Sequence, residues 1–338
     1  MSTNLIAAGL VALLPVLLFL GALIYYDSYD LVSPKKVATL ISAGIAAGIV
    51  AHLVNLSLMQ QMSIELGTYS RYLAPTVEEV LKATVIIALI KVHRIGFLID
   101  AAIIGFAVGT GFALYENLHY LQVIPDAHIG VWLVRGFGTA LMHAGTTGTF
   151  ALASFVLVEL KDTARFWMFF PGLAAAISIH SLYNHFFLSP ILSSLLILVG
   201  LPTLLLTVYR KGAQAVRDWL DVGFDADAEL LELINSGRFS ESHVGRYLQT
   251  LSTRFRGEIL IDLICYLRTF VELSLRAKGT LMLRESGFKI DADPDVATRI
   301  TELKYLESSI GKTGLLAVQP FLRLSRKDLW QLYMLKQR

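Results

Sequence analysis

Only one cysteine, Cys265, occurs in the 338-residue sequence, and charged side chains are also scarce. A single thiol excludes a disulfide within the chain and any zinc site built from cysteines. Asp, Glu, Lys and Arg make up 17 % of the residues, whereas 55 % are hydrophobic. The mean hydropathy of +0.60 is too high for a soluble globular chain of this length. The composition therefore predicts a protein of the lipid bilayer.

The few charges are unevenly distributed along the chain. Residues 1–209 hold 9 Lys/Arg and 10 Asp/Glu, and residues 210–338 hold 20 and 17. We therefore expect a transmembrane domain over 1–209 and a second, water-exposed domain over 210–338. The formal net charge of +2 mixes both signs and no basic block occurs, so nucleic acid is not expected as a partner.

The first domain contains long apolar runs of the kind that cross a membrane. A helix needs about 20 apolar residues to span the hydrocarbon core. Seven runs meet this need, at 5–26, 37–58, 72–91, 98–121, 131–158, 166–188 and 191–209. The last two are separated only by Ser189 and Pro190 and could form a hairpin, so six or eight spans are alternatives. The expected fold is an all-α, polytopic transmembrane helical bundle followed by an all-helical C-terminal domain.

Basic residues outside these runs predict the orientation of the bundle. They lie in alternate loops, with Arg71 as the exception. The positive-inside rule then places the amino terminus outside and residues 210–338 in the cytoplasm.

Charged side chains interrupt the apolar runs at a few positions. Glu78, Glu79, Lys82, Glu116 and Arg135 each carry an insertion penalty of about 3 kcal/mol near the centre of a bilayer, so the cluster needs a functional explanation. Arg135 lies near the outer boundary, where its side chain can reach water, and it is not assigned to the site.

Polar residues four apart indicate which helix faces meet. The pairs Glu78/Lys82, Glu116/Tyr120, His143/Thr147 and His180/Asn184 each share one helix face. We expect these faces to surround a hydrated cavity in the outer half of the membrane. The pairs Gly44/Gly48 and Gly105/Gly109 are small-xxx-small patterns that let helices approach closely.

The cluster contains the groups that peptide hydrolysis requires. Such a reaction needs a base for water, donors for the oxyanion and an acid for the leaving amine. Glu78, Glu79, Glu116, His143, His180 and Asn184 are the candidate catalytic residues. Adjacent residues lie about 100° apart on a helix, so one glutamate of the pair is expected to face the cavity while the other supports the structure.

Two mechanisms remain open at this point. In the preferred hypothesis a glutamate activates water without a cofactor, because no HExxH motif occurs. The alternative is a zinc ion held by His143, His180 and Glu79, since three N/O ligands plus water form a catalytic zinc pattern.

Four further residues are expected to support the site, and each also has a structural interpretation. Lys82 can be an ion-pair partner, and Tyr120 can be an anchor at the membrane interface. Thr147 can bond its own helix carbonyl, and Asn117 can join neighbouring helices.

Taken in order, four motifs on separate predicted helices resemble the PrsW family of bacterial intramembrane proteases. They are Glu78-Glu79-x-x-Lys82, Phe112-x-x-x-Glu116-Asn117-x-x-Tyr120, His143-x-x-x-Thr147 with Gly148, and His180-x-x-Tyr183-Asn184. The resemblance covers residues 72–188. It departs from the family pattern in the position of Gly148 and in the long tail after residue 209.

The resemblance implies a function as well as a fold. It implies a bacterial inner-membrane protease that cuts a membrane-anchored protein, such as an anti-sigma factor, near the outer side of the membrane. Glu78 or Glu79 would activate water with help from His143 and His180, and Asn184 would donate to the oxyanion. The alternative functions are an ion- or proton-coupled transporter and a non-catalytic immunity or scaffold protein.

The C-terminal domain shows no catalytic or metal-binding motif in the sequence. Asp225 and Ser240 are candidate N-caps and Gly237 is a candidate helix stop. Self-association or a cytoplasmic protein partner is the expected role of residues 210–338.

Overall fold

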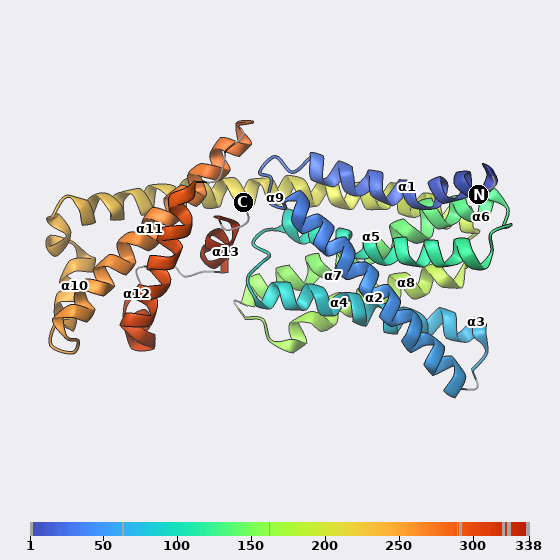
Figure 1. Cartoon of the computed structure of the whole chain (residues 1–338), viewed down its shortest axis with the longest axis horizontal. Coiled ribbons are helices and arrows are strands. Elements are labelled where there is room, and N and C mark those ends of the chain that lie inside the picture. Colours follow the sequence, from blue (N-terminus) through green and yellow to red (C-terminus); the bar gives the residue numbers. More distant parts are fainter. Residues whose placement is uncertain are drawn as a thin grey trace. The chain divides into compact units, whose positions relative to one another are not determined.

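The computed structural model of the chain describes residues 3–62, 64–161, 163–288, 290, 293–319, 322 and 326–335. Its regular elements are all helical and no strand occurs in these ranges, so the predicted all-α class is confirmed. The chain divides into two compact units, Met1–Ala213 and Gln214–Arg338, which we call unit 1 and unit 2. Figure 1 shows unit 1 in blue to yellow and unit 2 in yellow to red.

Unit 1 is a bundle of long helices. They are α1 (Thr3–Tyr25), α2 (Pro34–Gln61), α4 (Ala74–Lys91), α5 (Leu98–Val123), α7 (Ala140–Lys161), α8 (Phe170–His185) and the first part of α9 (Pro190–Asn235). Short segments lead into three of them: α3 (Leu66–Thr68) and η1 (Tyr69–Leu73) precede α4, α6 (Ile129–Val134) and η2 (Arg135–Thr139) precede α7, and η3 (Phe166–Phe169) precedes α8. Every predicted span is therefore a helix.

Six helical stretches in the described ranges are long and apolar enough to cross a membrane. The remaining expected span, α4, is 18 residues long but carries Glu78, Glu79, Lys82 and Lys91. Its neighbours compensate for this polarity, because Glu79 and Lys82 are buried inside the bundle rather than turned towards lipid.

Helix α5 is the central element of unit 1. It is buried continuously from Ile99 to Ala113 and packs against α1, α2 and α7 (Figure 1). Glycines permit these close approaches. A Cβ on Gly44 of α2 would collide with the Val108 carbonyl, and a Cβ on Gly109 would lie 2.5 Å from the His143 carbonyl oxygen of α7. The predicted close approach at the glycine pairs is thus present.

Three hydrogen bonds stabilise unit 1 near the carboxyl ends of α1 and α4. Lys36 Nζ donates to the Arg94 carbonyl at 3.1 Å, and Tyr209 donates to the Leu23 carbonyl at 2.5 Å. The Asp27 carboxylate, in the loop after α1, accepts from the Leu31 backbone N–H at 2.7 Å. The orientation of the bundle in the membrane stays a prediction.

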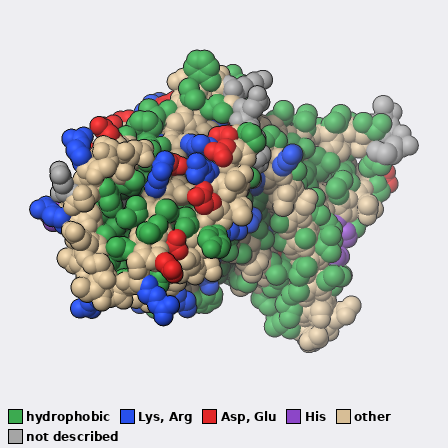
Figure 2. Space-filling model, turned by 60° about the vertical axis from the view of Figure 1, so that its left-hand side comes forward, with side chains coloured by type: hydrophobic (Ala, Val, Ile, Leu, Met, Phe, Trp, Pro, Cys, Tyr) green, Lys and Arg blue, Asp and Glu red, His purple; other side chains and the backbone are tan. Residues whose placement is uncertain are grey.

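Unit 2 contains the second part of α9 and the elements η4 (Arg238–Glu241), α10 (His243–Leu251), α11 (Gly257–Glu285), α12 (Pro294–Val318) and α13 (Arg326–Leu335). They share an apolar core to which Leu263, Phe270 and Ile300 contribute. Figure 2 shows Lys, Arg, Asp and Glu side chains spread over the surface of unit 2, whereas the face of unit 1 in that view is mainly hydrophobic.

Two of the expected helix caps in unit 2 are wrong. Asp225 lies inside α9, which continues to Asn235, and α10 is capped by Ser242, whose hydroxyl accepts from the Gly245 N–H. The predicted stop at Gly237 is confirmed, because this residue follows α9 with a φ of 72° that favours glycine.

Candidate active site

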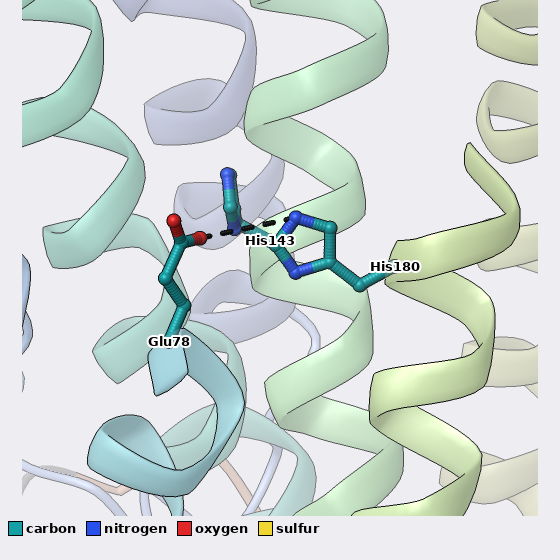
Figure 3. Close-up of side chains that lie close together, drawn as sticks. All are labelled: Glu78, His143 and His180. Carbon is teal, nitrogen blue, oxygen red and sulfur yellow. Dashed lines mark ion pairs between the residues drawn. The ribbon is translucent and has the colours of Figure 1, made fainter. Parts of the chain in front are cut away.

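Three helices bring one carboxylate and two imidazoles together inside unit 1. Glu78 lies in the second turn of α4, His143 in the first turn of α7 and His180 in α8 (Figure 3). One donor atom from each lies within 4.8 Å of the other two. His180 Nε2 is 3.8 Å from Glu78 Oε2, and the two imidazole rings meet edge to face at 4.7 Å.

One oxygen of the second glutamate contacts three neighbouring side chains. Oε1 of Glu79 accepts from Lys82 Nζ at 2.6 Å and from Thr146 Oγ1 at 3.1 Å, and it lies 2.8 Å from His180 Nδ1. Glu79 and Lys82 are both buried. A carboxylate behind Nδ1 orients an imidazole and leaves Nε2 available to a metal or substrate. Glu79 therefore supports His180, whereas Glu78 faces the cluster.

This arrangement changes the ligand set of the zinc alternative. The donors that lie together are those of Glu78, His143 and His180, and Glu78 takes the place expected for Glu79. The physical reason is that Lys82 pairs with Glu79 three residues before it, not with Glu78 four residues before it.

Glu116 and Arg135 form the other side of the cluster. Glu116 Oε2 lies 2.6 Å from His143 Nε2, and Arg135 Nη2 donates to Glu116 Oε1 at 3.0 Å. Arg135 Nε also donates to Asn117 Oδ1 at 2.9 Å, and its guanidinium lies 3.8 Å from the Tyr120 ring centroid. The expectation that Arg135 only reaches for water is wrong, because the side chain turns inward to this carboxylate.

Three expected site residues have contacts with backbone carbonyls. Thr147 Oγ1 donates to the His143 carbonyl at 2.9 Å, which is the local interpretation given above. Asn117 Nδ2 donates to the Ala12 carbonyl at 2.8 Å and so joins α5 to α1. Asn184 Nδ2 donates to the Ser70 carbonyl at 3.0 Å, and its role as an oxyanion donor stays a prediction.

The sequence did not single out several residues that contact the cluster. Thr146 bonds Glu79, and Asn55 of α2 donates to Glu78 Oε1 at 3.3 Å while accepting from Tyr69 at 2.8 Å. A lone Thr or Asn in an apolar run has no distinguishing signal. The π-helical segments η1 and η2, which precede the helices bearing Glu78 and His143, are of a type often found at functional sites.

The donor set fits a divalent metal ion such as zinc. Two imidazole nitrogens and one carboxylate oxygen form a three-ligand set that leaves a position for water. Glu116 Oε2 lies 2.6 Å from His143 Nε2, so this carboxylate contacts one of the three donors directly.

Buried carboxylates and imidazoles within a bundle of apolar helices define a polytopic membrane protein with a polar site inside it. The model of the family described as PrsW family intramembrane metalloprotease matches residues 34–209, which is more than half of the chain. The chain belongs to this family, and it is an integral membrane protein and an intramembrane protease. The match begins with α2, so α1 and unit 2 lie outside it.

No curated protein and no solved structure matches the chain. The family membership supports the protease prediction over the transporter and scaffold alternatives.

Proposed function

We propose that the protein is a metal-dependent intramembrane protease in which Glu78, His143 and His180 hold one zinc ion. The observation that carries this proposal is the approach of these three donors to within 4.8 Å from three different helices. The family description as a metalloprotease supports it. This proposal replaces the metal-free glutamate mechanism that the sequence favoured.

The supporting contacts fit this assignment. Metal-bound histidines commonly place their second nitrogen against a carboxylate or another polar group. Glu79 does this for His180 at 2.8 Å, and Lys82 Nζ lies 3.3 Å from His143 Nδ1. An ammonium group has only donors, so Nδ1 of His143 is an acceptor and Nε2 carries the proton, 2.6 Å from Glu116 Oε2. Binding of an ion through Nε2 would require this proton to move to Glu116. When bound, the ion would supply Lewis acidity to water and to the scissile carbonyl.

Glu116 is our candidate for proton transfer. It is half-buried, and Arg135 holds one of its oxygens at 3.0 Å while the other faces His143. The second oxygen would accept a proton from the attacking water and deliver it to the leaving amine, in exchange for its contact with His143 Nε2. Arg135 orients this carboxylate and supplies positive charge near the reacting groups.

The substrate class follows from the position of the cluster within apolar helices. We propose that the substrate is a membrane-anchored protein cut near the outer side of a bacterial inner membrane, with an anti-sigma factor as one example. Unit 2 would lie in the cytoplasm and bind a protein partner or a second copy of the chain.

The sole cysteine provides a direct test of this orientation. Cys265 is exposed in unit 2. A membrane-impermeant thiol reagent should label it only after the cells are opened. Labelling in intact cells would place unit 2 outside and contradict the assignment.

Cleavage in proteoliposomes tests the proposed chemistry. Single-pass substrates are mixed with the wild type and with Glu78→Gln, His143→Ala and His180→Ala variants, with Leu53→Ala of α2 as a lipid-facing control. We expect cleavage by the wild type and control only, its loss on chelation and its recovery with zinc. Full cleavage in the presence of chelator would restore the metal-free hypothesis.

A further inference from the structure

A cavity of about 230 Å³ lies beside the catalytic cluster, between α2, η1, α4 and α5. Glu78 and Glu116 form part of its wall. The rest comes from residues outside the cluster, among them His52, Leu56 and Met59 of α2. A substrate segment whose scissile bond reaches the two carboxylates would place a neighbouring side chain in this cavity.

The wall is largely aromatic and apolar. The His52 and His119 rings lie 4.4 Å apart, and Tyr115 lies nearly parallel to His119 with ring centroids 6.5 Å apart. Leu56 and Met59 form a rim that is 45 % and 38 % exposed, respectively. Ring faces and a flexible thioether pack well against bulky apolar side chains.

Polar groups of the cavity already have partners on the side of α4. Tyr69 donates to Asn55 at 2.8 Å, and Asn55 donates to Glu78 at 3.3 Å. This chain of hydrogen bonds ties η1 and α2 to the catalytic carboxylate. It fixes the shape of the cavity, so that the rim on α2 decides what can enter.

The volume limits the size of the occupant. One turn of an α-helix, with a diameter of 10–12 Å and a pitch of 5.4 Å, takes up about 400 Å³ or more. This exceeds the 230 Å³ of the cavity. The cavity can therefore enclose one bulky side chain but not a whole turn of helix. An extended segment frees the carbonyls that a helix keeps in hydrogen bonds.

We infer that this cavity is a side-chain subsite that binds a bulky apolar or aromatic residue next to the scissile bond of an extended substrate segment. Leu56 and Met59 set the upper size of that residue. The inference rests on the proposed proteolytic function and adds the substrate feature that the enzyme selects.

Size preference provides the first test. Single-pass substrates with Ala, Phe or Trp next to the cleaved bond are compared for the wild type, Leu56→Trp and Met59→Ala. We expect Leu56→Trp to lower the preference for Phe over Ala by about tenfold or more, since a filled pocket discriminates on this scale. Met59→Ala should improve cleavage of the Trp substrate.

Leu53→Trp is the matched control, because Leu53 lies on the same helix, is 60 % exposed and does not line the cavity. It should leave the preference unchanged. Equal preferences in the wild type, Leu56→Trp and Leu53→Trp would overturn the inference.

Photocrosslinking separates binding from cleavage. Synthetic single-pass helices carry one photoreactive leucine, scanned through their outer half, and are crosslinked to the full chain. The subsite is supported if crosslinks form to the cavity residues of α2 and α5 and disappear in Leu56→Trp but not in Leu53→Trp. This holds even if no cleavage occurs. Absent cleavage would then count against the proposed proteolysis alone. Crosslinks spread evenly over the bundle would overturn the subsite even if cleavage is intact.

Discussion

The close approach of α5 and α7 at Gly109 should make this glycine essential for activity although it bears no catalytic group. A Cβ at position 109 would lie 2.5 Å from the His143 carbonyl oxygen and 2.6 Å from Ala144 Cα, whereas ordinary contacts lie at 3.4–4 Å. Gly109→Ala must therefore move α7 by about 1 Å relative to α5. His143 and Glu116 lie on these two helices, so the displacement acts directly on the site.

The size of the effect follows from the tolerance of such sites. Metal–ligand distances must be met within about 0.2 Å. A misplacement of 1 Å can cost about 100-fold in rate. We expect Gly109→Ala to lower the rate of substrate cleavage by about 100-fold and to weaken zinc binding. Overpacking should also lower the free energy of unfolding by about 1–3 kcal/mol.

Two other glycines separate site geometry from stability. A Cβ on Gly105 would lie 2.8 Å from the Thr147 carbonyl oxygen, at the same interface but one turn further from the cluster, and a Cβ on Gly200 would meet nothing within 4 Å. Gly105→Ala should destabilise the protein with a smaller loss of cleavage, and Gly200→Ala should be neutral. Cleavage kinetics, zinc titration and thermal unfolding are measured for all variants. Unchanged cleavage and zinc affinity in Gly109→Ala would refute the reasoning.

Three further predictions concern the charged groups. Lys82→Met should lower the free energy of unfolding by roughly 3 kcal/mol, because it leaves the buried Glu79 without its cation. In thermal unfolding, the double variant Glu79→Gln with Lys82→Met should recover part of this loss. Arg135→Gln should slow cleavage at least tenfold while zinc affinity stays near the wild-type value, since Arg135 contacts Glu116 and not the three donors. A large loss of zinc affinity would contradict the separate roles of Arg135 in catalysis and of the three donors in zinc binding. Burial raises the pKa of Asp27 from 3.8 to about 6, so ionisation opposes folding, and stability should fall as pH rises from about 4 to 6 by up to about 3 kcal/mol. Asp27→Asn should lack this component in pH-dependent unfolding, and identical pH profiles for the two proteins would refute it.

The helices and the membership of the polar cluster were predictable from the sequence. Apolar runs of span length gave all seven helices of unit 1, because length and hydropathy alone decide what can cross a bilayer. The burial cost of charge marked Glu78, Glu79 and Glu116, and the four-residue spacing of polar pairs added His143 and His180. Their contacts in unit 1 agree with that grouping.

The roles within the cluster depend on helix rotation and side-chain direction, which spacing does not determine. The i,i+4 rule paired Lys82 with Glu78, but Lys82 points to Glu79 and His143. Depth suggested that Arg135 reaches water, yet a carboxylate and an aromatic ring on α5 attract it inward. The cap at Asp225 failed because α9 continues to Asn235, where its apolar side packs in the core of unit 2. The cap at Ser240 failed because this residue lies in η4 and Ser242 caps α10 instead.

The assignment of Glu78, His143 and His180 as metal ligands is tested most directly by zinc analysis of the purified protein. The account predicts one zinc ion per chain, with an X-ray absorption spectrum that shows nitrogen and oxygen ligands and no sulfur. Zinc should be lost in Glu78→Gln, His143→Ala and His180→Ala and retained in Leu53→Ala. Cleavage by a protein that contains no metal, or zinc that is retained in all three variants, would contradict the assignment.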